Sequence, residues 1–133
     1  MLQIDTTTQQ MSINRGDDNQ IFKLKVLTKD ETYYTFQIGD IVKFGVYEEK
    51  GFNKPAVLLK TIEVTEETQE LTITLTKEET TIGVLINKPV KYWYEIQVND
   101  NTVIGYTDDK NGPKIFKLFP EGSDVKNGSG EEW

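Results

Sequence analysis

The 133-residue sequence contains no cysteine and no histidine. Without cysteine, the chain cannot form disulfides, thiolate nucleophiles or cysteine metal sites. Without histidine, it lacks the commonest general base and metal ligand near neutral pH, so catalytic triads that need histidine are excluded. These absences predict a protein that is not an enzyme and that holds no cofactor and no metal.

Long apolar runs and excess positive charge are also missing. No segment approaches the roughly 18 apolar residues that a membrane helix needs, and Met1–Gln10 lacks the layout of a signal peptide. The formal net charge of -7 disfavours nucleic acid, because lysine and arginine supply most of the affinity for phosphates. We therefore expect no membrane and no nucleic acid among the partners and, because no catalytic residues are found, no small-molecule substrate.

Alternating side chains are the main positive feature. Phe22, Leu24 and Val26 alternate with Lys23 and Lys25, as in a strand with one buried face. Similar patterns elsewhere predict about seven or eight strands. They cover Gln20–Thr28, a short edge strand near Tyr33–Phe36, Ile41–Tyr47, Leu58–Val64, Leu71–Leu75, Val90–Val98, Thr102–Thr107 and Lys114–Phe119.

The connections between these strands carry recognisable signals. Glu66–Gln69 predicts a hairpin turn between Leu58–Val64 and Leu71–Leu75, and Asn99–Asn101 predicts a second hairpin turn. Thr76 and Glu79 have the spacing of a capping box, which predicts one short helix near residues 77–84.

The pattern as a whole predicts an all-β fold, an antiparallel β-sandwich of the Ig-like or Greek-key type. We expect an N-terminal arm over residues 1–12, the sandwich over residues 13–120, and a flexible acidic tail over residues 121–133.

Three short motifs have more than one interpretation. Arg15-Gly16-Asp17 matches an integrin-recognition tripeptide, although an ordinary turn explains it better. Asp108–Gly112 has the composition of a calcium loop but not its ligand register. Glu66 and Glu67 form an acidic pair in a predicted exposed turn, where charges facing solvent are the simpler explanation.

The aromatic strand Val90–Val98 places Tyr92 and Tyr94 on the core face and leaves Trp93 on the outer face. An exposed tryptophan can stack on a sugar ring or meet a protein, and tryptophan is enriched at protein interfaces. We assign Trp93, Tyr47 and Arg15 to a partner interface.

The order of four features resembles a known family. They are the turn Ile13–Asp17, the alternating strand after it, the helix start Leu75–Thr80 and the aromatic strand Lys91–Ile96. Together they are similar to the N-terminal domain of phage baseplate upper proteins, over roughly residues 10–120. The resemblance implies a non-catalytic virion protein of a tailed phage or prophage, assembled in the bacterial cytoplasm and located in the tail baseplate.

The implied partners are other tail or baseplate proteins, together with further copies of the chain in a homo-oligomer. A family member would continue into a longer C-terminal region, whereas this sequence stops at Trp133. Two alternatives remain open. One is a carbohydrate-binding module that uses exposed aromatic residues, and the other is a glycosidase that uses two carboxylates.

Overall fold

The computed structural model describes residues 2–4, 9–28, 30–49, 54–83, 88–104 and 114–120. Within these ranges the chain is mostly β, with nine strands and one short helix. In chain order they are β1 (Gln3–Ile4), β2 (Met11–Asn14), β3 (Gln20–Leu24), β4 (Ile41–Tyr47), β5 (Leu58–Glu63), β6 (Leu71–Leu75), α1 (Lys77–Thr80), β7 (Val90–Val98), β8 (Asn101–Ile104) and β9 (Lys114–Phe119).

Most of the predicted strands are confirmed, and four of them have the predicted bounds: β4, β6, β7 and β9. Strand β3 ends at Leu24, earlier than predicted. The predicted edge strand near residues 33–36 was wrong, because Tyr33 and Phe36 form only isolated bridges, to Leu27 and Thr68.

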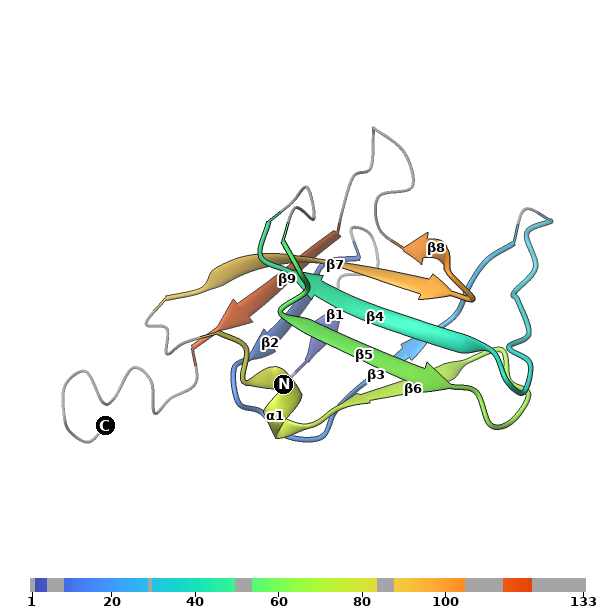
Figure 1. Ribbon diagram of the computed structural model, residues 1–133, viewed down its shortest axis with the longest axis horizontal. Helices are drawn as coiled ribbons and strands as arrows, with labels where there is room; N and C mark the ends of the chain where they lie inside the picture. Colours follow the sequence, from blue (N-terminus) through green and yellow to red (C-terminus); the bar gives the residue numbers. More distant parts are fainter. Residues whose placement is uncertain are drawn as a thin grey trace.

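Seven strands form one sheet, in which β1, β2, β9, β7, β4 and β5 lie side by side in that order (Figure 1). The nine-residue strand β7 is the centre of this sheet. One of its edges pairs with β4, and the other is shared by β9 along Val90–Tyr94 and by β8 along Ile96–Val98.

The prediction of a purely antiparallel fold was wrong at one pair, because β2 and β9 run parallel. Parallel neighbours need a connection of at least a dozen residues. Here the connection contains all of β3 to β8, so the N-terminal strand β2 can lie beside the C-terminal strand β9. The sheet is therefore mixed, and it is not closed into a barrel.

Strands β3 and β6 form a second, two-stranded sheet that packs on the inner face of the larger one. Phe44 of β4 joins the two, since its ring centre lies 5.4 Å from that of Phe22 in β3. Phe44 also contacts Tyr94 and Phe116, at 5.7 and 6.2 Å between ring centres. The two sheets thus share one core, with Tyr92 and Tyr94 buried in it as predicted.

The predicted hairpin between β5 and β6 was wrong. Strand β5 pairs with β4 in the large sheet, whereas β6 pairs with β3 in the small one. The turn over residues 65–70 therefore crosses from one sheet to the other. The inward side of each strand faces the shared core either way, so the alternation could not distinguish these two arrangements.

The capping box is confirmed, although the helix is shorter than predicted. Thr76 Oγ1 accepts from the Glu79 backbone, and the Glu79 carboxylate accepts from the Thr76 backbone at 2.8 Å. Lys60 of β5 bonds the same carboxylate at 2.9 and 3.1 Å, which ties the helix to the sheet. The helix ends at Thr80, and Ile82 beyond it is buried in the core.

The hairpin between β7 and β8 is confirmed. Asn99 and Asp100 both have positive φ angles, 49° and 69°, as the two central residues of a type I′ turn require. Strand β1 and the start of β2 lie within residues 1–12, which were predicted to be an arm. The predicted tail over residues 121–133 lies outside the described residues.

Candidate protein interaction surface

The outer face of the large sheet carries the side chains that point away from the core. Register places Tyr47 of β4 opposite Trp93 of β7, and Trp93 in turn opposite Ile115 of β9. Leu59 of β5 lies opposite Gly45, next to Tyr47, and it is 59% exposed. These four residues, Tyr47, Leu59, Trp93 and Ile115, are called the outer patch below.

Gly45 decides how Tyr47 lies on this face. A Cβ atom at position 45 would come within 2.9 Å of Tyr47 Oη and 3.0 Å of Cε2, so the ring of Tyr47 lies over the glycine. The hydroxyl reaches across to β7 and donates to Glu95 Oε1 at 3.3 Å. A side chain at position 45 would prevent this arrangement.

The environment of Tyr47 alters its acidity. Burial raises the pKa of the Tyr47 phenol, and the negative charge and hydrogen bond of Glu95 raise it further. Gln97 also donates to Glu95 Oε1, at 3.3 Å. The phenol therefore stays neutral, and its ring is held in one orientation by Gly45 beneath it and Glu95 beside it.

Trp93 lies on the outer face, as the alternation predicted, but it is half-buried. Tyr47 is half-buried too. Alternation within β7 alone predicts that Trp93 is a single ring on this face. The register instead gives it an aromatic neighbour on one side and an aliphatic neighbour on the other, so the patch extends over four strands.

A shallow hollow of about 190 Å³ lies on this face at Tyr47 and Leu59. Its remaining lining comes from Lys43, Gly45, Glu95 and Gln97. Apolar surface bordered by a few polar groups is typical of both protein interfaces and small ligand sites.

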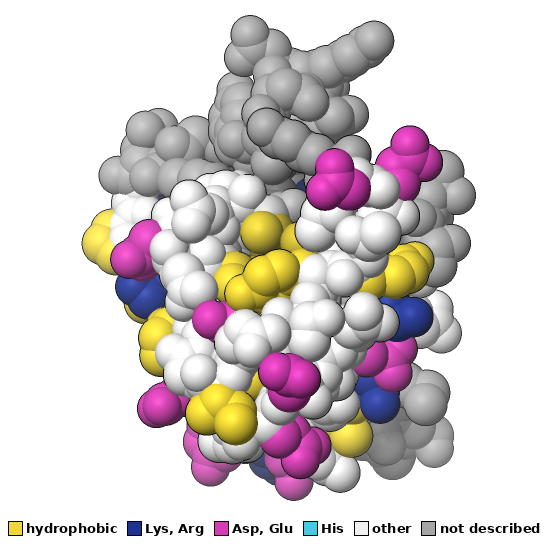
Figure 2. Space-filling view, turned by 90° about the vertical axis from the view of Figure 1, so that its right-hand side faces the viewer, with side chains coloured by type: hydrophobic (Ala, Val, Ile, Leu, Met, Phe, Trp, Pro, Cys, Tyr) yellow, Lys and Arg dark blue, Asp and Glu magenta, His cyan; other side chains and the backbone are white. Residues whose placement is uncertain are grey.

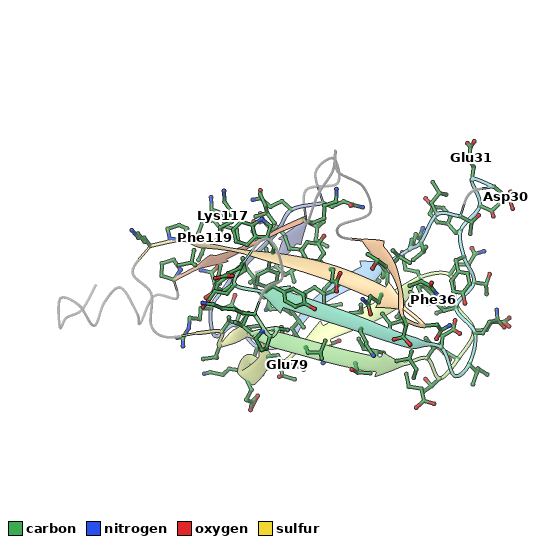
Figure 3. The ribbon with its side chains drawn as sticks, turned by 45° about the horizontal axis from the view of Figure 1, so that its top comes forward. Asp30, Glu31, Phe36, Glu79, Lys117 and Phe119 are labelled. Carbon is green, nitrogen blue, oxygen red and sulfur yellow. The ribbon has the colours of Figure 1, made fainter. Side chains whose placement is uncertain are left out.

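Two lysines continue the outer face beyond Trp93. Lys91 of β7 and Lys117 of β9 lie directly opposite each other. The Lys117 ammonium group lies 5.4 Å from the centre of the Phe119 ring, and Figure 3 shows these two residues together at one end of the molecule. Lys91 and Lys117 are called the lysine strip below.

The structure places Arg15 inside the fold, although it was assigned to a partner interface. Arg15 is only 7% exposed. Nε donates to the Ile82 carbonyl at 2.9 Å and Nη2 to the Gly83 carbonyl at 3.0 Å. These hydrogen bonds tie the guanidinium group to the segment after α1, and Arg15 and Gly16 form a turn, which fits the turn interpretation of the tripeptide.

The remaining sequence candidates are Glu66, Glu67 and residues 108–112. Glu66 and Glu67 are exposed in the turn between the sheets. Residues 108–112 lie outside the described residues. In the described ranges, acidic side chains are not grouped in threes that could hold a metal ion. No helix among the described residues is long and apolar enough to cross a membrane.

A second hollow, of about 390 Å³, lies between β3 and the strands β2 and β7. Its lining is largely apolar and includes Met11, Phe22 and Leu24. The Tyr94 hydroxyl at this hollow already donates to the Gln9 carbonyl at 2.5 Å. We regard it as an open side of the core and not as the candidate site.

No family model matches the chain, and no curated protein or solved structure matches it.

Sequence reasoning found Tyr47 and Trp93 but missed Gly45 and the lysine strip. A glycine within the otherwise regular strand Ile41–Tyr47 is a signal that something approaches the backbone closely, and this signal was available. The strip had no such signal, because Lys91 and Lys117 are 26 positions apart and meet only through the register of β7 and β9.

Proposed function

We propose that this chain is a non-catalytic assembly module that binds neighbouring proteins through the outer patch. The observation that carries the proposal is the pairing of Tyr47 with Trp93 beside the exposed Leu59. Tyrosine and tryptophan supply much of the binding energy in protein interfaces, because they bury large areas with few rotatable bonds. Gly45 and Glu95 hold Tyr47 in place before a partner arrives, which lowers the entropy cost of binding.

We also propose that the two sheets are a variant of the β-sandwich, of the Ig-like or Greek-key type. The shared core and the pairing of strands distant in sequence, such as β4 with β7, support this assignment. The parallel β2–β9 pair is then an addition at the edge of the sandwich.

The proposed setting is the tail baseplate of a phage or prophage, with other tail or baseplate proteins and further copies of this chain as partners. The order of sequence motifs supports it. Two of those motifs also meet in the structure, since Gly16 donates to the Thr80 carbonyl at 3.3 Å and Thr80 donates to the Asp17 carbonyl at 2.6 Å. Their contact supports treating them as one structural unit and not as separate coincidences.

The test is binding of the purified chain to the tail proteins encoded beside it, measured by calorimetry. Trp93→Ala and Tyr47→Ala should each weaken binding by about tenfold or more, as expected for hot-spot residues. Leu27→Ala is the matched control, because Leu27 is 60% exposed but lies outside the outer patch. Equal binding by wild type and both patch variants would refute the proposal, provided that circular dichroism shows them folded.

A second function, carbohydrate binding, is favoured by one specific observation. Tyr47 lines the hollow that Lys43, Glu95 and Gln97 border with polar groups, and Trp93 lies opposite Tyr47 on the next strand. Aromatic rings next to hydrogen-bonding side chains suit a saccharide, whose faces are apolar and whose edges are polar. A glycan array that responds to wild type but not to Trp93→Ala would support this function, whereas a blank array would eliminate it.

A further inference from the structure

The lysine strip places two positive charges close together, and the described part of the fold offers no negative charge that offsets their repulsion. Lys91 and Lys117 lie directly opposite each other, and like charges at such cross-strand positions repel. Among the described residues, no acidic group forms an ion pair with either lysine. In a chain with a net charge of -7, such a strip fits an anionic partner.

Acidic side chains are exposed at the other end of the molecule. The turn over residues 65–70 carries Glu66, Glu67 and Glu70, all exposed, and it is called the acidic turn below. Glu70 is ion-paired with Lys23 and Lys25 at 3.8 and 3.9 Å, so among the described residues Glu66 and Glu67 carry the unpaired negative charge of this turn. A hollow of about 250 Å³ lies between this turn and the end of β5, lined by Glu63, Glu66 and Glu70 among others. Figure 2 shows that Asp and Glu predominate over Lys and Arg on this side of the molecule.

The two charged regions cannot meet within one molecule. Figure 3 shows Lys117 at one end and Phe36 at the other, and Phe36 is bridged to Thr68 of the acidic turn. Figure 1 agrees, since β9 ends on the left whereas β5 ends and β6 begins on the right. A second copy of the chain can bring them together.

We propose that the lysine strip binds the acidic turn of a second copy, so that the chain associates head to tail. This inference rests on the proposed assembly function and identifies one of its partners. Because the two surfaces differ, the contact is heterologous and leaves one strip and one turn free in each dimer. Repeating the same contact from one copy to the next therefore builds a ring or a filament.

The aromatic neighbours of the strip favour such a contact. Trp93 follows Lys91 on the same face of β7, and Phe119 lies beside Lys117. Apolar groups around an ion pair exclude water from it, which strengthens the attraction between opposite charges. The contact should still weaken with salt, because its outer rim is exposed.

Sedimentation velocity of the full chain tests the proposal over a range of protein concentrations, at low and high salt. Wild type should associate as concentration rises, and high salt should weaken the association. Lys91→Glu should weaken it by about tenfold or more, because it places like charges in the contact. The control Lys77→Glu makes the same change in net charge at an exposed position of α1 and should leave association unchanged.

Reversing the charges of the lysine strip and of the acidic turn in separate variants distinguishes this contact from any other mode of association. The double variants Lys91→Glu/Lys117→Glu and Glu66→Lys/Glu67→Lys should each be monomeric, whereas an equal mixture of the two should associate. Circular dichroism establishes that each variant is folded.

A monomeric wild type, double variants that associate as wild type does, or a mixture of folded variants that stays monomeric would each overturn the inference. Failure here remains distinguishable from failure of the proposed function. Trp93→Ala tests tail-protein binding through the outer patch. A loss of that binding would support the proposed function even if the chain were monomeric.

Discussion

Gly45→Ala offers the sharpest test of how the outer patch is built. The new Cβ would lie 2.9 to 3.1 Å from three atoms of Tyr47, whereas comfortable contacts with carbon are about 3.5 to 4.0 Å. The obstructing atoms belong to the far end of a flexible side chain. We therefore expect the Tyr47 ring to swing off the sheet while the strand stays intact.

Two opposing contributions set the stability change. Replacing glycine by alanine in a compatible backbone stabilises by about 0.4 to 1 kcal/mol, because the unfolded chain has less freedom to lose. Losing the hydrogen bond between Tyr47 and Glu95 costs about 1 kcal/mol. Urea denaturation should therefore show a net change within about 1 kcal/mol.

The acidity of Tyr47 gives a readout that needs no partner. The pKa of the phenol is raised by burial and by Glu95, so releasing the ring should lower that pKa toward its ordinary value. Nuclear magnetic resonance of ring-labelled tyrosine through an alkaline titration measures it. Tail-protein binding should weaken by about tenfold in the same variant, because the ring is no longer held in place.

A double-mutant cycle supplies the control. In a Tyr47→Ala background the added Cβ meets no ring, so Gly45→Ala should show only the stabilising backbone contribution. An unchanged pKa of Tyr47 in Gly45→Ala would refute the reasoning, as would unfolding of that variant.

Three further predictions concern stability. Phe44→Ala should destabilise the fold by about 3 to 5 kcal/mol in urea denaturation, because it removes the ring that joins the two sheets. The control Ile38→Ala, at a 73% exposed position, should change stability by less than about 0.5 kcal/mol. Arg15→Met should cost about 1 to 3 kcal/mol by leaving two carbonyls without donors, and an unaffected unfolding midpoint would contradict the role given to Arg15. Burial raises the pKa of Glu79, but the bonds from Lys60 and Thr76 outweigh burial and hold that pKa below its ordinary value. Because the folded-state pKa is lowered, the ionised carboxylate stabilises the fold above the ordinary glutamate pKa, and this stabilisation is lost as pH falls through the lowered value. Glu79→Gln should therefore be less stable than wild type by about 1 to 2 kcal/mol at neutral pH, and its stability should approach that of wild type in acid. A difference in the free energy of unfolding that persists in acid would refute this prediction.

The sequence alone determined which segments are extended and which side of each faces inward. Alternation predicted β4, β6, β7 and β9 with their observed bounds, and Phe44 and Tyr94 are buried as their positions required. The capping box at Thr76 likewise marked the start of α1. These features depend on neighbours within a few positions, so they can be recognised locally.

Only the tertiary structure decided which strands are paired. Turn signals predicted a hairpin between β5 and β6, yet these strands lie in different sheets, and β2 pairs in parallel with β9. Pairing depends on how apolar faces from the whole chain are buried together, and the period-two pattern is the same for every choice of neighbour.

The candidate surface shows the same division. Alternation placed Tyr47 and Trp93 on outer faces, but the register of β4 and β7 made them neighbours. Arg15 was predicted to face a partner, whereas its guanidinium group donates to carbonyls of residues 67 and 68 positions later. Periodicity along the chain gives each side chain its direction, and only packing between distant segments decides what it meets.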